Sequence, residues 1–265
     1  MTQRRQAQTE PCSDQTVRER LNAVALERDL RPSTRIAYQR CMSQLGILDE
    51  PVSAVTQAMV VDRLWALSNP NTRRGAAIAA RSVLGFQIKI GKAVPRRYTL
   101  PSEQDIRLAA MTSPHATRIL LMAFCALRVS EAAGVTRADL SGDRLRIDKQ
   151  NQTLRETGKP TVTRITETKC AASDVPVPYW LIPQVEALTE PVKADNLRES
   201  LRRAGARVGV PMNPHMLRHW AATTLLERGA TLVTVSRVLR HSTIQQTAAV
   251  YIQVDDAAAV HSAFG

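Results

Sequence analysis

The sequence predicts a mainly α-helical protein with a small three-stranded β insert, divided into two domains. Along most of the chain, apolar residues recur every three or four positions, which is the spacing of an amphipathic helix. Between residues 143 and 178, alternating apolar and β-branched residues instead indicate short strands. The segment GKAVPRRYTLP at 91–101 breaks both patterns and carries Gly91, Pro95 and Pro101, so it predicts a linker between the domains.

Residues 1–91 are expected to form a compact helical domain of the core-type DNA-binding kind. Ser13 and Asn71 are placed to cap the first and fourth helices, and Pro32 begins the second. Small residues in the fourth helix, among them Ala76, suit close packing against its neighbours. The four helices are predicted at residues 14–29, 31–48, 56–67 and 72–90.

A linker is expected at 92–101, and residues 102–265 are expected to form a mostly helical catalytic domain. Its first helix begins after Ser102, a capping residue. The segment TRILLMAFCAL at 117–127 is apolar nearly all round and predicts a buried helix. From Ala194 onward every segment again has helical spacing. The β insert is predicted as strands at 143–149, 161–169 and 173–178.

The formal net charge of +12 predicts a polyanionic partner. Between residues 63 and 97 there is no Asp or Glu, whereas a solvated helix face ordinarily mixes both signs. This pattern favours contact with phosphates. Aromatic residues make up only 4% of the chain, so stacking on unpaired bases is not the expected mode of binding. The basic residues expected to contact DNA are Arg63, Arg73, Arg74, Arg81, Lys89, Lys92, Arg96 and Arg97.

The four cysteines form no CxxC pair, so neither a zinc cage nor a disulfide framework is predicted. The N-terminal segment MTQRRQAQTEPC lacks the apolar stretch of a signal peptide, and no segment has the length of a membrane-spanning helix. We therefore expect a cytoplasmic protein that does not bind membranes.

Polar residues of the second domain recur in an informative order. Each alone has an ordinary interpretation, such as a helix-end ion pair for Arg128 and Glu131 or a core position for Tyr251. The ordered motifs are ALRVSE at 126–131, TK at 168–169, HMLRH at 215–219, LRH at 239–241 and VYIQV at 250–254. Together with the stretch PSTRIAYQRCMSQL in the first domain, this set resembles the tyrosine recombinase (phage integrase) family.

The sequence departs from the family pattern at several points. Ala126 and Arg240 stand where a glycine is usual in the arginine box and in the LGH box. The interval between the histidine of the LRH motif and the tyrosine is one residue longer than the commonest form, and the interval that follows Lys169 is one residue shorter. Lys159 lies in the same insert as Lys169 and is an alternative for its role.

Cleavage of a phosphodiester requires charge stabilisation on the nonbridging oxygens, an activated nucleophile and a protonated leaving oxygen. Many enzymes use metal ions held by clustered carboxylates for the first task. The sequence offers no convincing carboxylate cluster, so no metal and no other cofactor is expected. Guanidinium groups are planar, permanently charged and matched to phosphate, which makes Arg128 and Arg218 the natural pair for this task. Glu131 is expected to orient Arg128, and His219 and Trp220 to support the site by packing.

The resemblance implies a role for each remaining residue of the ordered set. Tyr251 would attack phosphorus and form a 3′-phosphotyrosyl link that conserves the phosphodiester energy, so rejoining needs no ATP. Lys169 would protonate the leaving 5′-oxygen. His215 would assist Tyr251 as a general base, and His241 would donate a hydrogen bond to a nonbridging oxygen.

The resemblance implies a site-specific recombinase, whose two domains clamp a DNA duplex like a C. The expected partner is double-stranded DNA with an attachment or core site, bound by a homotetramer that assembles from monomers. An accessory directionality or host factor is a further partner that the resemblance allows. The expected role is integration or excision of a phage or other mobile element in a bacterial cell. The first helix is predicted near residue 14, so we expect no arm-binding domain, and the tail after Tyr251 is expected to pack on a neighbouring protomer.

Four alternatives remain open. A Xer-like recombinase that resolves chromosomes or plasmids would share the whole pattern. A type IB topoisomerase would share the chemistry but would relax any supercoiled plasmid. A non-catalytic DNA-binding protein would have no need of six catalytic residues in order. A metal-dependent integrase of the acidic-triad class would lose its activity in EDTA.

Overall fold

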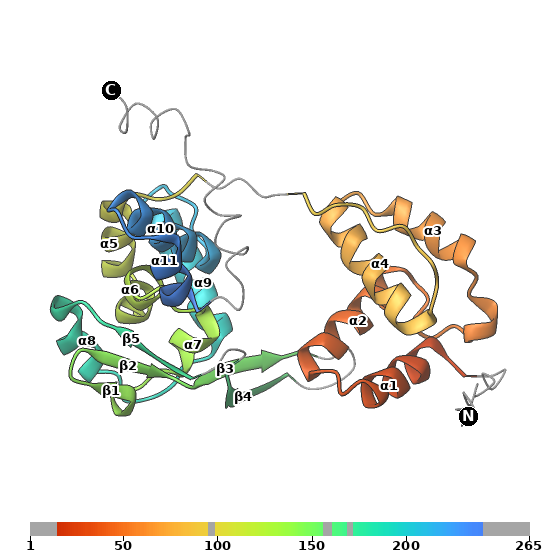
Figure 1. The fold of residues 1–265 in the computed structure, drawn as a ribbon, viewed down its shortest axis with the longest axis horizontal. Helices are drawn as coiled ribbons and strands as arrows, with labels where there is room; N and C mark the ends of the chain where they lie inside the picture. Colours follow the sequence, from red (N-terminus) through yellow and green to blue (C-terminus); the bar gives the residue numbers. More distant parts are fainter. Residues whose placement is uncertain (1–14, 95–98, 156–160, 169–171, 241–265) are drawn as a thin grey trace, which may run out of the picture. The chain divides into compact units, whose positions relative to one another are not determined.

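The structure of the protein is a computed structural model, and it describes residues 15–94, 99–155, 161–168 and 172–240. The chain forms two compact units (Figure 1). One comprises Met1–Arg97 and Leu154–Thr161, and the other comprises Tyr98–Thr153 and Val162–Gly265. Each unit has its own cluster of buried apolar side chains. Within the described residues, no helix is both long enough and apolar enough to cross a membrane.

The described residues of the first unit form four α-helices, all at places where the sequence predicts a helix (Figure 1). Helix α4 packs against the other three. Its Ala76, Ala79 and Ala80 are fully buried, because a methyl group lets neighbouring backbones approach closely. The elements are α1 (Val17–Glu27), α2 (Pro32–Gln44), the 3-10 helix η1 (Val52–Ala54), α3 (Gln57–Ala66) and α4 (Pro70–Leu84).

The first turn of α1 is closed by a capping box. Thr16 Oγ1 accepts a hydrogen bond from the backbone N–H of Glu19 at 3.2 Å, and Glu19 Oε2 accepts one from the backbone N–H of Thr16 at 2.8 Å. The cap is therefore Thr16, and the prediction of Ser13 is wrong.

The bounds of α4 differ from the predicted range 72–90. The φ of Pro70 is fixed near the helical value, so the helix begins there and its cap is Asn69 rather than Asn71. The side-chain oxygen of Asn69 accepts a hydrogen bond from the backbone N–H of Asn71 at 2.9 Å. At the other end, Gly85 adopts a φ of 75° and ends the helix, so the segment after it is not helical.

The second unit is mostly helical in its described residues. Ser102 caps α5 as predicted, with its Oγ accepting a hydrogen bond from the backbone N–H of Asp105 at 3.1 Å. Ile119, Leu121 and Met122 of α6 are fully buried, which confirms the predicted buried helix. The helices are α5 (Glu103–Met111), α6 (Ala116–Phe124), α7 (Val129–Gly134), η2 (Arg137–Asp139), η3 (Tyr179–Leu181), α8 (Ile182–Glu186), α9 (Ala194–Arg207), α10 (Pro214–Glu227) and α11 (Leu232–Leu239).

The β insert confirms the predicted fold class, but it contains more strands than predicted. Five short strands form two sheets within the described residues, where three strands were expected. A three-stranded antiparallel sheet has the order β1-β2-β5, with Leu145 of β2 opposite Val175 of β5. A separate two-stranded sheet pairs β3 with β4. The strands are β1 (Leu140–Ser141), β2 (Arg144–Ile147), β3 (Lys149–Leu154), β4 (Val162–Glu167) and β5 (Ser173–Pro176).

Strand β3 lacks apolar alternation because its buried residues are polar. Gln150 and Asn151 are buried, and each finds a backbone acceptor far along the chain. Gln150 Nε2 donates to the carbonyl of Glu167 at 2.8 Å, and Asn151 Nδ2 donates to the carbonyl of Val192 at 2.7 Å. These bonds offset the cost of burying the two amide N–H groups. A search for apolar residues misses the strand because its buried residues are polar.

Candidate active site and nucleic-acid interface

Arg128 lies at the start of α7, directly after a tight bend. Helix α6 ends at Phe124, and Ala126 has a left-handed backbone with a φ of 51°. The Arg128 backbone N–H donates to Glu131 Oε2 at 2.8 Å, and Arg128 Nη1 donates to Glu131 Oε1 at 2.9 Å. Glu131 therefore holds both the backbone and the guanidinium of Arg128 in one orientation, as the sequence predicts.

Arg218 lies on α10 and is buried, with 7% of its surface exposed. Asn213 caps this helix and accepts a hydrogen bond from the backbone N–H of His215 at 3.0 Å, so His215 lies in the first turn and Arg218 close behind it. Arg218 Nη1 donates to the carbonyl of Ala126 at 2.5 Å, and its Nη2 donates to the carbonyl of Leu239. The guanidinium of Arg218 is thus anchored on backbone oxygens.

Backbone carbonyls at the end of α11 accept hydrogen bonds from both Arg128 and Arg218. Arg240 ends the helix in a left-handed conformation with a φ of 51°. Its carbonyl accepts a hydrogen bond from Arg128 Nη2 at 3.3 Å, while the preceding carbonyl, of Leu239, accepts one from Arg218. Two guanidinium groups that are distant in sequence are therefore anchored on neighbouring carbonyls, which a helix C-terminus leaves available.

Glu131 is buried, with 1% of its surface exposed, and two cations hold it. Besides its bonds with Arg128, its Oε2 pairs with Nη2 of Arg240, whose side chain is also buried. Burial alone would raise the pKa of Glu131, but the charge of Arg240 and the charge and hydrogen bonds of Arg128 hold the pKa below its ordinary value. Glu131 is therefore ionised at neutral pH and balances the buried positive charge.

His215 and His219 are neighbours on α10, with ring centroids 5.3 Å apart. His215 is exposed, whereas His219 is half-buried. Burial, and then the charges of His215 and Arg218, lower the pKa of His219, which favours its neutral form. Trp220 is buried and meets the ring of Phe124 edge-on at 5.2 Å, so it packs in the core.

The structure describes part of the predicted catalytic set. The predicted residues that it describes are Arg128, Glu131, His215, Arg218 and His219. The predicted site residues that lie outside the described residues are Arg96, Arg97, Lys169, His241 and Tyr251, together with the alternative Lys159. Arg128 contacts Glu131 directly, and Arg128 and Arg218 donate to the neighbouring carbonyls of Arg240 and Leu239.

Three basic residues that the sequence assigns to DNA contact bind backbone carbonyls inside the first unit. Arg74 Nη1 donates to the carbonyl of Gly91 at 3.0 Å. Arg63 Nη1 donates to the carbonyls of Leu45 and Gly46, each at 2.9 Å. Arg73 donates to carbonyls at the end of α3, with the shorter bond reaching Leu67 at 2.7 Å. The bonds of Arg63 and Arg73 satisfy acceptors that the ends of α2 and α3 leave open.

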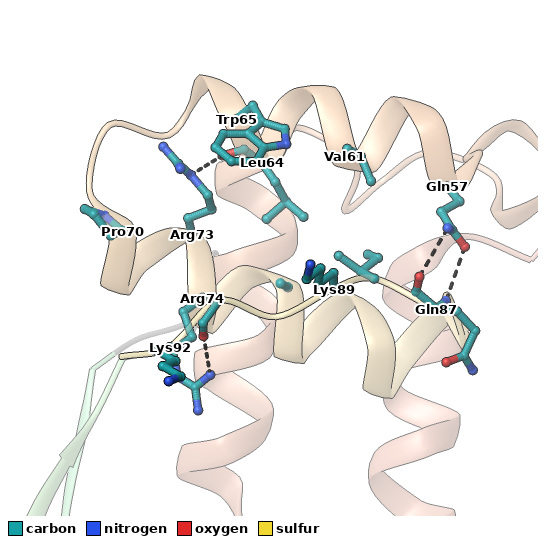
Figure 2. A pocket seen from close by; sticks show the side chains of 13 residues that line it. Gln57, Val61, Leu64, Trp65, Pro70, Arg73, Arg74, Gln87, Lys89 and Lys92 are labelled. Atoms are coloured by element: carbon teal, nitrogen blue, oxygen red, sulfur yellow. Dashed lines mark hydrogen bonds between the residues drawn. The ribbon is translucent and has the colours of Figure 1, made fainter. Parts of the chain in front are cut away.

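A pocket of about 550 Å³ lies in the first unit between α3, α4 and the segment that follows α4 (Figure 2). Leu64 and Ala77 belong to its apolar lining. Trp65 is 68% exposed, and the Arg73 guanidinium lies 4.5 Å from the centre of its ring. Among the described residues that line the pocket there is no carboxylate, and the cations are Arg73, Arg74, Lys89 and Lys92.

Residues 92–258 match the model of a protein family described as the phage integrase family. The matched range is more than half of the chain and contains all the ordered motifs of the second domain. The chain belongs to the phage integrase family. The resemblance drawn from the sequence is thereby confirmed.

The curated relatives of this phage integrase family member include tyrosine recombinases named XerC. The XerC of Brucella suis biovar 1 (strain 1330) is 31% identical over 285 residues, which cover 89% of this chain and 88% of that protein. The XerC of Rhizobium meliloti (strain 1021) is 32% identical over 156 residues, which cover 54% of this chain and 46% of that protein. In that match and two similar ones, the chain spans about half the length of the relative.

Solved structures share the fold of this family member. The Tn1549 transposon integrase in complex with transposon right end DNA has a TM-score of 0.68 at 17% identity, covering 94% of this chain and 98% of that one. A lambda integrase dimer bound to a COC′ core site has a TM-score of 0.65 at 15% identity, covering 92% of this chain and 79% of that one. Both likenesses confirm a two-domain integrase fold.

Two buried arginines of this phage integrase family member have contacts that sequence reasoning does not reveal. Arg118 donates to the carbonyls of Ala132, Val135 and Glu190, and burial lowers its pKa to about 10. These bonds fix the end of α7. An arginine inside an otherwise apolar helix is the feature of the sequence that could have indicated such a buried role. Arg240 is visible in the sequence only as a departure from the usual glycine.

Proposed function

We propose that the protein is a site-specific DNA recombinase of the integrase type, which cleaves and rejoins duplex DNA through a 3′-phosphotyrosyl intermediate. The observation that carries this proposal is the anchoring of Arg128 and Arg218 on the carbonyls of residues 126, 239 and 240. Two permanently charged, planar groups fixed near each other suit one phosphate.

The anchoring also supports efficient charge stabilisation. A guanidinium has several N–H donors, so a group that donates to a carbonyl can also donate to a nonbridging oxygen of the phosphate. Because Glu131 and the carbonyls orient the two groups before DNA arrives, little reorganisation is needed when charge develops on the phosphate. The Arg128 side chain is 31% exposed, which makes it reachable by the substrate.

The chemical step follows from the family resemblance. The phenolic oxygen of Tyr251 attacks phosphorus while the bond from phosphorus to the 5′-oxygen breaks. The 5′-oxygen takes a proton from Lys169, with Lys159 as the alternative donor, and His215 accepts the phenolic proton. His241 donates a hydrogen bond to a nonbridging oxygen. The same steps in reverse rejoin the strand.

The first unit is proposed to bind the duplex through phosphates. Arg81, Lys89 and Lys92 are exposed on α4 and the segment after it, which supports such contacts. Arg63, Arg73 and Arg74 already donate to carbonyls, and we assign the main contribution of Arg63 and Arg73, whose acceptors lie at helix ends, to the shape of this unit. The solved neighbours named above are integrases bound to DNA, which supports the same partner here. The other proposed contacts are Arg74, Arg96 and Arg97.

The biological substrate is proposed to be an attachment or core site of a phage or other mobile element. The enzyme would act as a homotetramer in the cytoplasm of a bacterial cell, with an accessory directionality or host factor as a further partner. A Xer-like recombinase that resolves chromosomes or plasmids is the second candidate, and it is favoured by the names of the curated relatives.

A library of duplexes, mapped for covalent cleavage in EDTA, tests the proposal. A recombinase should form adducts at one recurring sequence, and the yield should not depend on a divalent metal. Relaxation of supercoiled plasmids regardless of their sequence would favour a type IB topoisomerase. Cleavage that appears only when a divalent metal is added would contradict the proposal.

A further inference from the structure

Arg240 occupies an unusual position for an arginine. Its backbone has a φ of 51° and a ψ of 48°, a left-handed conformation that glycine tolerates and other residues disfavour. Its side chain is only 5% exposed, although arginine is rarely buried without a partner. A glycine would satisfy the bend without burying a charge, so the bend does not account for the arginine.

The side chain and the backbone carbonyl of Arg240 both contact residues of the candidate site. Its Nη2 pairs with Glu131 Oε2, and its Nη1 donates to the carbonyl of Val238 at 3.3 Å. Its own carbonyl accepts a hydrogen bond from Arg128 Nη2 at 3.3 Å, while Arg128 Nη1 donates to Glu131 Oε1 at 2.9 Å. Arg128, Glu131 and Arg240 thus form a closed ring of contacts between α7 and the end of α11.

The relative placement of the two phosphate-binding candidates depends on this ring. Arg128 belongs to the start of α7 and Arg218 to α10, but both are anchored on carbonyls at the end of α11. If that end shifted relative to α7, the anchors of both guanidinium groups would shift with it. The ion pair of Arg240 with Glu131 is a contact between two buried side chains that ties the end of α11 to α7.

We infer that Arg240 is a positioning residue, which locks the end of α11 onto Glu131 and thereby sets the placement of Arg128 relative to Arg218. The inference rests on the proposed function, because it concerns the rate of DNA cleavage. It assigns a role to a charged side chain at a position where the family usually has glycine.

Two variants of Arg240 separate the effect of its charge from the effects of side-chain length and backbone strain. Arg240→Lys and Arg240→Met have side chains of similar length and meet the same backbone strain, but only lysine can pair with Glu131. The cleavage rate is measured in a single turnover, on a saturating duplex that carries the mapped site, beside DNA affinity and thermal unfolding. We expect Arg240→Met to cleave about 10- to 100-fold more slowly at nearly unchanged affinity, the scale of a small misplacement of reacting groups. Arg240→Lys should recover most of the rate.

Two controls accompany these variants. Arg237→Met removes a cation from an exposed position on the same helix and should leave the cleavage rate unchanged. If Arg240→Met does not fold, Arg240→Gly replaces it, because glycine fits the left-handed backbone. The same slow cleavage is expected from Arg240→Gly.

A double variant tests whether Arg240 acts on Arg128 through Glu131. In a Glu131→Gln background, Arg240→Met should cause little further loss, since the partner through which it acts has already lost its charge. An equal fold loss in both backgrounds would overturn the inference, as would wild-type cleavage by Arg240→Met. A wild-type protein that forms no adduct on any duplex would overturn the proposed function itself, and the inference with it.

Discussion

At the residue scale, the candidate site depends on two left-handed backbone positions and one buried carboxylate. Ala126 and Arg240 both have a φ of 51°, and their carbonyls accept hydrogen bonds from Arg218 and Arg128 respectively. The buried carboxylate of Glu131 balances the charges of the partly exposed Arg128 and the buried Arg240. Removing one member of a buried ion pair leaves the other uncompensated, so Glu131 should be costly to neutralise.

We expect Glu131→Gln to lower the free energy of unfolding at neutral pH by about 3 to 5 kcal/mol, because it removes the carboxylate that pairs with the buried guanidinium of Arg240. It should also slow DNA cleavage, since Arg128 loses its ionic partner. Denaturant unfolding measures the first effect. Glu103→Gln, on a carboxylate that is much more exposed, is the matched control and should cost little. Equal losses for the two variants would contradict the role assigned to Glu131.

The pH dependence of this loss has a definite sign. The pKa of Glu131 in the folded protein lies below its ordinary value of 4.5. Its ionised form therefore contributes stability that is fully present above about pH 4.5 and is lost as the pH falls through the lower folded pKa. The unfolding free energies of the wild type and Glu131→Gln should converge as the medium is acidified. Curves that stay parallel down to about pH 3 would show that another group carries the effect.

At the element scale, α10 carries three of the predicted active-site residues, His215, Arg218 and His219. Asn213 caps it and Pro214 occupies its first turn, so the helix begins at a defined place. His215 and Arg218 follow within its first turns. A loosened start of α10 would therefore displace both side chains together, whereas the apolar residues further along would keep the helix in the core.

Asn213→Ala should lower the free energy of unfolding by about 1 kcal/mol, the usual cost of losing an N-cap side chain. Cleavage should also slow, because His215 and Arg218 lie in the turns that the cap orders. Asn213→Asp keeps an acceptor at the same position and should retain both properties. Denaturant unfolding measures the stability of both variants, and single-turnover assays measure their cleavage rates. If the alanine variant matched the wild type in both, the start of α10 would not depend on its cap.

Sequence reasoning succeeds at several places where neighbouring residues decide the structure, although it misplaces the caps of α1 and α4 by two or three residues. The cap at Ser102 and the pairing of Arg128 with Glu131 both involve residues three positions apart, so a motif reveals them. The sequence does not predict strand β3, because Gln150 and Asn151 bond to backbone carbonyls that only the folded chain brings near them. The same holds for the pairing of residue 240 with residue 131, which lie 109 positions apart.

At the scale of the whole molecule, the net charge of +12 and the acid-free stretch of residues 63–97 place much of the positive charge in the first unit. The contacts of this unit divide those cations into two groups. Arg63, Arg73 and Arg74 bind carbonyls, whereas Lys89 and Lys92 are exposed beside the pocket. The exposed group is the one that should set the salt dependence of DNA binding.

The double variant Lys89→Ala, Lys92→Ala should bind duplex DNA more weakly, with a smaller dependence on salt. Each lost phosphate contact should reduce the slope of log affinity against log salt by about 0.9. Arg63→Met is the control, because it removes a cation that binds carbonyls and should mainly lower the stability of the first unit. Binding measured over a range of salt concentrations gives the slopes. An unchanged slope in the double variant would exclude the two lysines as phosphate contacts.

The most direct measurement identifies the atom that becomes bonded to DNA. The protein is incubated with a nicked duplex that carries the mapped site, the trapped adduct is digested with protease and nuclease, and the modified peptide is sequenced by mass spectrometry. We predict a nucleotide joined through its 3′-phosphate to Tyr251, and no adduct from a Tyr251→Phe variant that still binds the duplex. A phosphate on any other residue, or adducts that persist in Tyr251→Phe, would contradict a recombinase that works through Tyr251.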